Sequence, residues 1–459
     1  MFLHPSPNLP MTNVSLPLDF LEDASQELAQ FLIRQLSPGE HLSLDVMGET
    51  SQFIRFNHSR VRQIGTVEDG SITLKYSYQE RTSEATIPFT GDRPRDQQLA
   101  GDALTLLRQE TAQLPVDPYL TPPENHGSSQ EIYHGQLLAA DQVVDVLLSG
   151  VEDLDFTGIY SGGTIFRGNY NSAGQHHWFA TTTYCLDYSL FTAAGKAVKA
   201  TLAGSQWQPE QYAEQLKRGR YQLRQLEEPV KILPPGRYRT YLAPAATAEL
   251  VGMLSWGAVS ESSLRQGQSA LFPLTQGQHL SPLITLQENF SQGTVPRFNS
   301  EGEIAPMELA IIEQGILKTF LINRRTAEEY QLVSNGANTS ESLRSPQLLP
   351  GTLANQDILT ALDTGLYLSN LHYLNWSDRP KGFMTGMTRY ACFWVEKGEI
   401  IAPIQDLRFD ESLYRFWGES LINLTDETEW IPHTDTYERR SLGGSLVPGM
   451  LVADFNFTL

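Results

Sequence analysis

The chain has 459 residues and carries 33 Lys and Arg against 53 Asp and Glu, which gives a formal charge of −20 at pH 7. So acidic a chain repels phosphate backbones, and its basic runs are short, which argues against direct binding of nucleic acid. With 40% hydrophobic and 10% aromatic residues it can build packed cores, which excludes disorder as its main state.

Neither a membrane span nor a secretion signal is predicted. No run of about 18 apolar residues occurs. The first twenty residues carry four prolines and lack the basic start and apolar centre of a signal peptide. The two cysteines, Cys185 and Cys392, are far apart in the sequence and form no disulfide framework. We therefore expect a cytoplasmic protein with free thiols.

The N-terminal region predicts helices beside antiparallel strands. Residues 16–35 and 96–114 have apolar residues near helical spacing, and the first of these helices ends at Ser37-Pro38-Gly39. Between them, residues 53–89 alternate β-branched or aromatic residues with polar ones, which predicts a meander of strands broken at Glu68-Asp69-Gly70. Four prolines between 115 and 126 predict a linker, so we place a domain boundary near residue 120.

Residues 121–230 predict a smaller unit of similar type. A helix is expected over 138–149, Thr- and Tyr-rich strands over 155–188 with a turn near Gly162-Gly163, and a helix after Pro209. From about 231 the chain becomes rich in strand patterns, with one early helix expected at 244–260. The predicted fold class is α+β, with regions 1–120, 121–230 and a large antiparallel β-rich domain over 231–459.

Patterns of known catalytic chemistry are scarce. No two histidines lie three to five residues apart, and the adjacent His176-His177 point to opposite faces of a strand, so a surface or strand-end pair is expected. No C-x-x-C, G-x-S-x-G or phosphate-binding loop occurs. Cys392 lies between bulky apolar residues and is expected to be a core residue rather than a nucleophile.

Three segments resemble the TldD/PmbA family. Residues 298–330, FNSEGEIAPMELAIIEQGILKTFLINRRTAEEY, resemble its hairpin with E-x-G-x-L-K followed by an Arg-bearing helix. Residues 365–407 resemble its closing strands, which include G-L-Y and W-x-E-x-G-E-I. Residues 53–77 resemble its amino-terminal strands. The likeness therefore extends over nearly the whole chain in the same order.

The resemblance also implies which kind of subunit this is. The family is described as peptidases in which the catalytic subunit carries H-E-x-x-x-H on one helix, with a Cys near the carboxyl terminus completing a zinc site. Here the corresponding helix is 245–260, where Ser255 and Ser260 stand at the His positions and Trp256 at the Glu position. No Cys follows Cys392. The likeness thus implies a PmbA/TldE-like subunit with no catalytic residue, metal ligand or cofactor of its own.

We accordingly expect a component of a metallopeptidase that acts on unfolded or short peptides. Its partner would be a TldD-like subunit that supplies the zinc, in a heterodimer. Arg324, Arg389 and Trp394 are candidates for the wall of a peptide groove, unless the arginines are ordinary surface charges. Two alternatives stay open: a homodimeric module that binds peptides or a protein without cleaving them, and a self-sufficient hydrolase that uses Cys392.

Overall fold

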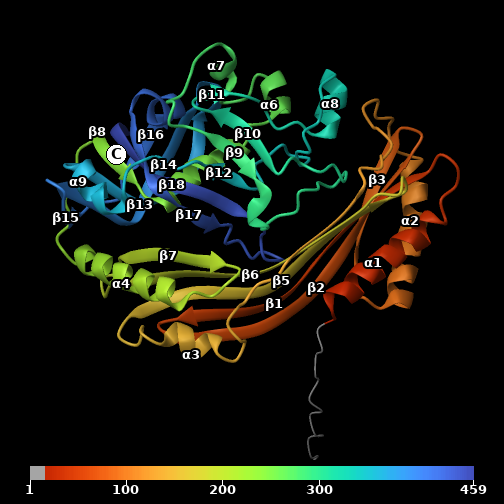
Figure 1. The fold of residues 1–459 in the computed structure, drawn as a ribbon, viewed down its shortest axis with the longest axis horizontal. Coiled ribbons are helices and arrows are strands. Elements are labelled where there is room, and N and C mark those ends of the chain that lie inside the picture. Colours follow the sequence, from red (N-terminus) through yellow and green to blue (C-terminus); the bar gives the residue numbers. More distant parts are fainter. Residues whose placement is uncertain (1–15) are drawn as a thin grey trace, which may run out of the picture.

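A computed structural model describes residues 16–459 and contains two β-sheets, one in each half of the chain (Figure 1). The expectation about a secretion signal falls mainly on residues 1–15, which lie outside the described residues. Among residues 16–459, no helix is long and apolar enough to cross a membrane.

The first sheet has seven strands in the order β3-β2-β1-β5-β6-β4, with β7 also paired to β6. All pairs are antiparallel except β4 with β6. The strands are β1 (His41–Asn57), β2 (Arg60–Tyr78), β3 (Arg81–Pro88), β4 (Ser128–Tyr133), β5 (Asp155–Asn171), β6 (His176–Phe191) and β7 (Ala197–Gly204).

Four helices accompany this sheet, as the periodicity predicts: α1 (Leu18–Ile33), α2 (Arg93–Thr111), α3 (Val143–Leu148) and α4 (Pro209–Leu226). Helix α2 begins after Asp92, whose side chain accepts a hydrogen bond from Arg95 N, and α4 begins with Pro209, where a missing N–H does no harm. Helices α1 and α2 lie beside the sheet (Figure 1). Their leucines are buried in one cluster with side chains of β1 and β2. The predicted helices and the meander are confirmed.

The two N-terminal sequence regions contribute to a single sheet. Strand β1 pairs with β5 from Ser43 opposite Asn171 to Phe56 opposite Gly158. Strands from both sides of the boundary predicted near residue 120 therefore share one ladder. The boundaries at 120 and 230 stay predictions.

Two predicted interruptions are wrong. Strand β2 runs through Glu68-Asp69-Gly70, because it stays paired with β1 over this stretch. Strand β5 runs through Gly162-Gly163 without a turn. A Cβ on Gly163 would lie 2.0 Å from Thr50 O, so glycine is needed there because β1 passes close by.

The second sheet has eleven strands in the order β11-β10-β9-β12-β18-β16-β14-β13-β8, with β15 on β14 and β17 on β18. It is mixed, because β13 with β8 and β12 with β18 are parallel. Its strands are β8 (Gly236–Leu242), β9 (Leu286–Asn289), β10 (Glu308–Glu313), β11 (Ile316–Leu317), β12 (Pro346–Leu348), β13 (Gly365–Asp378), β14 (Phe383–Glu396), β15 (Glu399–Pro403), β16 (Arg408–Ser412), β17 (Leu421–Pro432) and β18 (Gly444–Phe457).

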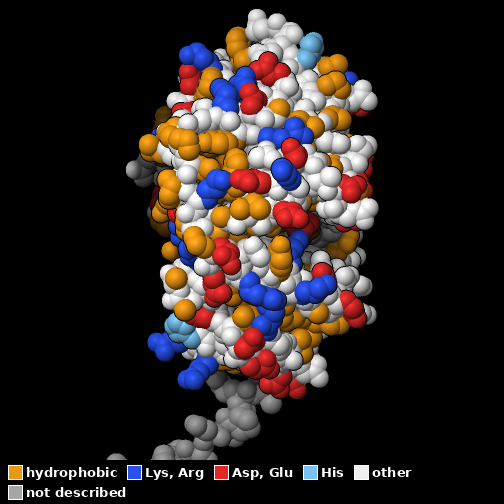
Figure 2. Space-filling model, turned by 90° about the vertical axis from the view of Figure 1, so that its left-hand side faces the viewer, with side chains coloured by type: hydrophobic (Ala, Val, Ile, Leu, Met, Phe, Trp, Pro, Cys, Tyr) orange, Lys and Arg blue, Asp and Glu red, His pale blue; other side chains and the backbone are white. Residues whose placement is uncertain are grey.

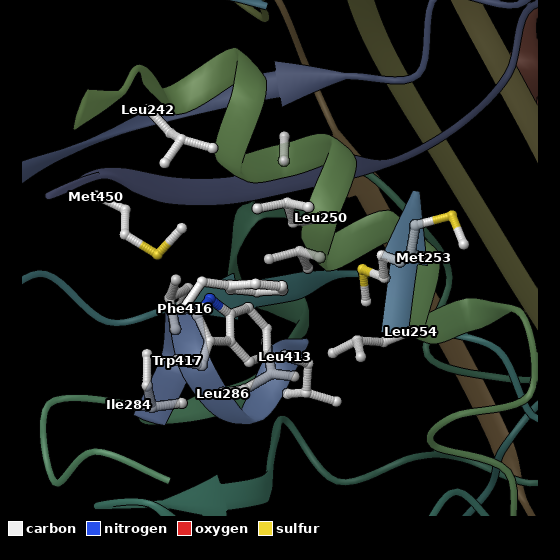
Figure 3. Close-up of a cluster of buried hydrophobic side chains, with 14 of the residues drawn as sticks. Leu242, Leu250, Met253, Leu254, Ile284, Leu286, Leu413, Phe416, Trp417 and Met450 are labelled. Carbon is white, nitrogen blue, oxygen red and sulfur yellow. The ribbon is translucent and has the colours of Figure 1, made fainter. Parts of the chain in front are cut away.

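Short helices complete this half: α5 (Pro244–Gly252), α6 (Glu261–Arg265), α7 (Phe272–Thr275), α8 (Arg324–Tyr330) and α9 (Ile358–Leu362). Helix α5 lies against the sheet, and its Leu250 packs in a core that includes Phe416 and Trp417 (Figure 3). Together the two halves confirm the α+β class with a β-rich C-terminal domain.

Direct packing joins the halves. Phe56 and Phe156 of the first sheet belong to the same buried cluster as Ala391 and Phe393 of β14. The rings of Phe56 and Phe156 meet edge to face, with centroids 5.6 Å apart. The two halves of the chain therefore share a buried core rich in aromatic residues.

Candidate functional site

A cavity of about 430 Å³ lies between the first sheet and the connection from β17 to β18; we call it the inter-sheet cavity. Its walls carry hydroxyl-bearing, aromatic and imidazole side chains from both halves of the chain. From the first half they include Tyr133, His134, Ser161, Thr181, Thr183, Tyr184, Cys185 and Ser205, and from the second half Thr294, Trp430, His433, Thr434, Asp435, Arg440 and Ser441.

Arg440 fastens the β17–β18 connection to the first sheet. Its guanidinium is buried, and it donates to the carbonyl oxygens of Gly163 and Thr183, at 3.2 and 2.9 Å. It also donates to the hydroxyls of Ser51 and Thr183. Its main-chain N–H donates to the buried Glu49 carboxylate at 3.1 Å. One wall of the cavity is thus held by contacts with three strands.

Two titratable side chains of the cavity, Cys185 and His433, have shifted pKa values. Burial raises the pKa of the Cys185 thiol to about 12, so it is protonated. His433 is exposed at the surface, although desolvation by the atoms around it lowers its pKa. Asp435 accepts a hydrogen bond from Tyr437 N. A protonated thiol is a poor nucleophile, so this arrangement favours binding of a polar ligand over covalent catalysis.

The three positions of the missing metal motif do not share one helix. The helix expected over 244–260 is wrong beyond residue 255, because α5 ends at Gly252 and a 3₁₀ turn follows over Met253–Ser255. Trp256 follows this turn and is 56% exposed. Ser260 precedes α6. Gly257, with φ of +84°, lies between the two, in a conformation that ends helices.

Both serines are hydrogen-bonded within the chain. Ser255 Oγ accepts a hydrogen bond from Leu343 N at 3.2 Å. Ser260 Oγ accepts from Ser263 N at 3.0 Å and donates to the buried Glu341 carboxylate at 2.6 Å. The Ser260 hydroxyl thus stabilises the start of α6, and both hydroxyls hold residues 341–343 against this part of the chain.

Replacing Ser260 by alanine should lower the free energy of unfolding by about 1–2 kcal/mol, because α6 loses its N-cap and a buried carboxylate loses a donor. Urea denaturation would measure this. Ser262→Ala is the matched control, since Ser262 Oγ only accepts from the exposed Gln266 amide. The control should change stability by less than about 0.5 kcal/mol. Equal losses in both variants would contradict the assigned role.

Arg324 lies near the Ser260 end of that motif, since Leu321 forms a β-bridge with Ser260 and Asn323 N donates to Glu341, which also accepts from Ser260. Its Nη2 donates to Pro122 O and to the Glu124 carboxylate, both at 2.8 Å. It also lines a smaller cavity of about 230 Å³ together with Lys75 and Glu301. Arg324 thus ties α8 to the proline-rich linker.

Arg389 and Trp394 both lie on β14. Arg389 is half exposed, and its Nη1 is 3.9 Å from the Asp406 carboxylate. The Trp394 ring lies under Lys231 Nζ, 4.7 Å from the ring centroid, and its Nε1 donates to Glu396. The structure therefore does not bring the three groove candidates together. On the side of β15 and α9, Figure 2 shows basic and acidic side chains intermixed.

Cys392 is a core residue, as expected. Its side chain is 4% exposed and packs in the cluster around Trp417. Burial raises its pKa to about 11. We expect neither Cys392 nor Cys185 to react with a thiol reagent such as DTNB in the native state within minutes, and both to react in denaturant. Fast labelling of the native chain, located to Cys392 by mass spectrometry, would instead support a nucleophilic thiol.

The residues present do not fit a zinc ion at the position the family resemblance implies. Hydroxyls of Ser255 and Ser260 are poor ligands near neutral pH, and the Trp256 indole neither binds zinc nor takes a proton. Across residues 16–459 no three His, Cys, Asp or Glu side chains are grouped so that they could hold a metal ion.

Comparisons with known proteins agree with this architecture. Residues 235–459 match the family model described as the PmbA/TldA metallopeptidase C-terminal domain. The β-rich second half is therefore a domain of that class. The chain belongs to the TldD/PmbA family. No protein with a curated description matches it.

Solved structures share the fold along nearly the whole chain. A proposed modulator of DNA gyrase from Thermotoga maritima is 16% identical, with a TM-score of 0.74, and the match covers 95% of this chain and 100% of that one. TldE from Thermococcus kodakarensis is 14% identical, with a TM-score of 0.74 and the same coverage. A proposed modulator of DNA gyrase from Bacteroides thetaiotaomicron is 14% identical, with a TM-score of 0.73, covering 95% and 98%.

The residues that build the inter-sheet cavity were not predicted from the sequence. Arg439-Arg440 is visible in the sequence only as a short basic pair, and His433 as an isolated histidine. The sequence does contain one signal for this wall of the cavity. The eleven residues between β17 and β18 are rich in charged and hydroxyl side chains and are flanked by Pro and Gly, which is typical of a functional loop. Their partners lie on strands more than two hundred residues away.

Proposed function

We propose that this chain is the PmbA/TldE-like component of a TldD/PmbA-family metallopeptidase, that it lacks a zinc site of its own, and that it pairs with a zinc-bearing TldD-like subunit. The observation that carries the proposal is the use of Ser255 and Ser260. Where the resemblance requires two imidazoles, both hydroxyls form hydrogen bonds inside this chain. Zinc and the base that activates water would come from the partner.

Unfolded or short peptides are the proposed substrates. The inter-sheet cavity supports this, because hydroxyls such as those of Thr183 and Ser205 can exchange hydrogen bonds with a peptide main chain. Arg389 and Trp394 remain proposed peptide contacts on β14, and Arg324 a separate one near the linker. A cytoplasmic location is proposed because both cysteines are free thiols.

The test compares the purified full chain, alone and mixed with a TldD-like chain from the same organism. Alone, the chain should hold far less than one zinc per molecule by elemental analysis and should not cleave a denatured casein probe. The mixture should form a complex on affinity capture and cleave the probe, and EDTA should abolish cleavage.

A matched control is the TldD-like chain with the Glu of H-E-x-x-x-H changed to Gln, which should bind this chain without cleaving casein. Cleavage by this chain alone, at a rate unaffected by EDTA, would overturn the proposal. A TldD-like chain that cleaves equally well without it, and does not bind it, would overturn the pairing.

A further inference from the structure

Arg167 lies on the central strand β5 of the first sheet, between Met47 of β1 and Phe179 of β6. Its neighbour Phe166 is buried in the cluster that contains the leucines of α1 and α2. Because successive residues of a strand face opposite sides of a sheet, the Arg167 side chain points away from those helices. With Met47 and side chains from residues 433–442 it lines a groove of about 560 Å³, which we call the Arg167 groove.

The Arg167 guanidinium has few partners inside the chain. It donates one hydrogen bond, from Nη1 to the carbonyl oxygen of Phe166 at 2.8 Å, and it forms no ion pair within residues 16–459. Arg440, which lines the same groove, makes four side-chain hydrogen bonds. A guanidinium carries several N–H donors, and Arg167 is only partly exposed to water. Most of its donors are therefore left for a ligand.

The charges around Arg167 do not compensate it. Desolvation lowers the pKa of Arg167 to about 10, and the nearby Arg439 guanidinium acts in the same direction, whereas Glu49 acts against it. The Glu49 carboxylate already accepts hydrogen bonds from Ser51 Oγ and from the main-chain N–H of Arg440. Arg167 is thus charged at neutral pH and poorly solvated. Such a cation costs free energy, and a bound anion would remove that cost.

Acidic residues at the groove leave Arg167 unoccupied. Asp435 and Glu438 line the groove, but both are exposed, and neither forms an ion pair in the part of the chain that the structure describes. Asp435 accepts a hydrogen bond from Tyr437 N. Asp69 binds the Arg439 side chain through Nε. The groove therefore offers an anion the Arg167 guanidinium, with that of Arg439 nearby.

The Arg167 groove adjoins the inter-sheet cavity. The two share five lining residues: His433, Asp435, Arg440, Ser441 and Leu442. A peptide that binds the hydroxyls of the cavity through its main chain can therefore extend toward Arg167. The planar fork of a guanidinium matches a carboxylate, to which it donates two parallel hydrogen bonds. The ligand chemistry that fits the groove is thus the carboxylate of a peptide.

We propose that the Arg167 groove binds a carboxylate of the peptide held in the inter-sheet cavity, with Arg167 as the main contact and Arg439 beside it. The inference rests on the proposed function for its peptide ligand and adds a preference: a peptide that places a carboxylate in the groove binds better than a neutral one. A C-terminal carboxylate and an Asp or Glu side chain share this chemistry, and the experiment separates them.

Binding of matched peptides to the full chain, with no zinc-bearing partner present, tests the proposal. The probes are alanine pentapeptides with an uncharged BODIPY label at the amino terminus, followed by fluorescence anisotropy. One pair is the free acid and its C-terminal amide; the other pair is two amides with Glu or Gln at the central position. In at least one pair the carboxylate should tighten binding roughly tenfold. A preference in the first pair identifies the terminal carboxylate, and one in the second pair identifies a side chain.

Arg167→Gln should reduce this ratio of dissociation constants to about one, because the amide cannot bind a carboxylate as a charged fork does. Arg55→Gln is the matched control: Arg55 lies on the same sheet, forms no ion pair within residues 16–459 and lines neither cavity. The control should keep the preference. Arg167→Gln should also be at least as stable to urea as the wild type, since it removes a desolvated charge and breaks no ion pair. A loss of both stability and preference would assign Arg167 a structural role.

Three results would overturn the proposal: equal binding within both pairs, no binding of any probe up to about 1 mM, and a preference that persists in Arg167→Gln. The test is separate from that of the proposed function. If this chain and a TldD-like chain cleave casein together but no preference exists, this inference alone fails. A preference found without pairing or cleavage supports this inference and overturns only the proposed function.

Discussion

Replacing Arg440 by alanine should lower the free energy of unfolding by about 3–5 kcal/mol, which is a large fraction of the stability of a typical domain. The guanidinium is 5% exposed and donates to the carbonyl oxygens of Gly163 and Thr183. Alanine would leave these acceptors buried without a donor. It would also remove a positive charge that acts on the Glu49 carboxylate, which is 2% exposed.

The neighbouring arginine provides the control. Arg439 donates to the Asp69 carboxylate at 2.8 Å, and both side chains are partly exposed, at 21% and 44%. An exposed pair of this kind contributes less than about 1 kcal/mol. Urea denaturation of Arg440→Ala and Arg439→Ala should therefore separate them by at least about 2 kcal/mol. If the two variants lose the same stability, Arg440 does not fasten the β17–β18 connection as described.

The same substitution should affect the inter-sheet cavity. Residues 433–443 form one wall, and within this stretch Arg440 makes the hydrogen bonds to β5 and β6. Limited proteolysis should cut Arg440→Ala in this stretch faster than it cuts the wild-type chain, since the segment loses its buried anchor. Arg439→Ala should be cut at nearly the wild-type rate.

Local patterns predicted the elements whose partners are close in sequence. Leucines at helical spacing gave α1, and Pro209 gave the start of α4. The antiparallel strands β1, β2 and β3 follow from alternation and from tight turns between neighbours. These elements depend mainly on residues within one or two turns of themselves.

Contacts between distant segments were not predictable in this way. The pairing of β1 with β5 joins residues more than one hundred positions apart, and a single sequence contains no signal for it. A glycine in a strand-like sequence can mark either a turn or a close contact between strands. Gly163 predicts a turn, but in the structure it allows β1 to pass close to β5. The helix expected over 244–260 is too long, because the prediction followed the apolar pattern. Gly252 and Gly257 in the same stretch are typical of helix ends, and α5 does end at Gly252.

The candidate site also combines a part that is predictable from the sequence with a part that is not. The family resemblance identifies Ser255, Trp256 and Ser260 as the position of the missing metal motif, and in the structure both serines form hydrogen bonds within the chain. The cavity itself is assembled from β4, β6, β7 and the β17–β18 connection, which meet only in the folded chain. The position of the motif is therefore predictable from the sequence, whereas a cavity formed by tertiary packing is not.

His177 should make the protein lose stability on mild acidification. The side chain is fully buried, with Nδ1 2.8 Å from Ser129 Oγ and its ring stacked on Phe298 at 5.4 Å. Burial, aided by the nearby His176 and His126, lowers its pKa from 6.5 to about 4. The expected surface pair is therefore wrong for this residue, because β4 and the Phe298 segment cover it.

The sign of the effect follows from proton uptake. As the pH falls below about 6.5 the unfolded chain binds a proton at His177, whereas the folded chain does not until the pH nears 4. Stability from this residue is thus complete above pH 6.5 and declines between 6.5 and 4. The loss should reach about 2 kcal/mol between pH 8 and pH 5.

Urea denaturation of the wild-type chain and of His177→Gln at pH 8 and pH 5 would measure this contribution. Glutamine keeps an amide that can bond to the Ser129 hydroxyl but does not titrate, so the variant should lose about 2 kcal/mol less than the wild type on acidification. An equal loss in both proteins would contradict the assignment. Because Phe298 belongs to the second half of the chain, protonation at His177 acts on the contact between the two halves, the same contact that Arg440 fastens at the inter-sheet cavity.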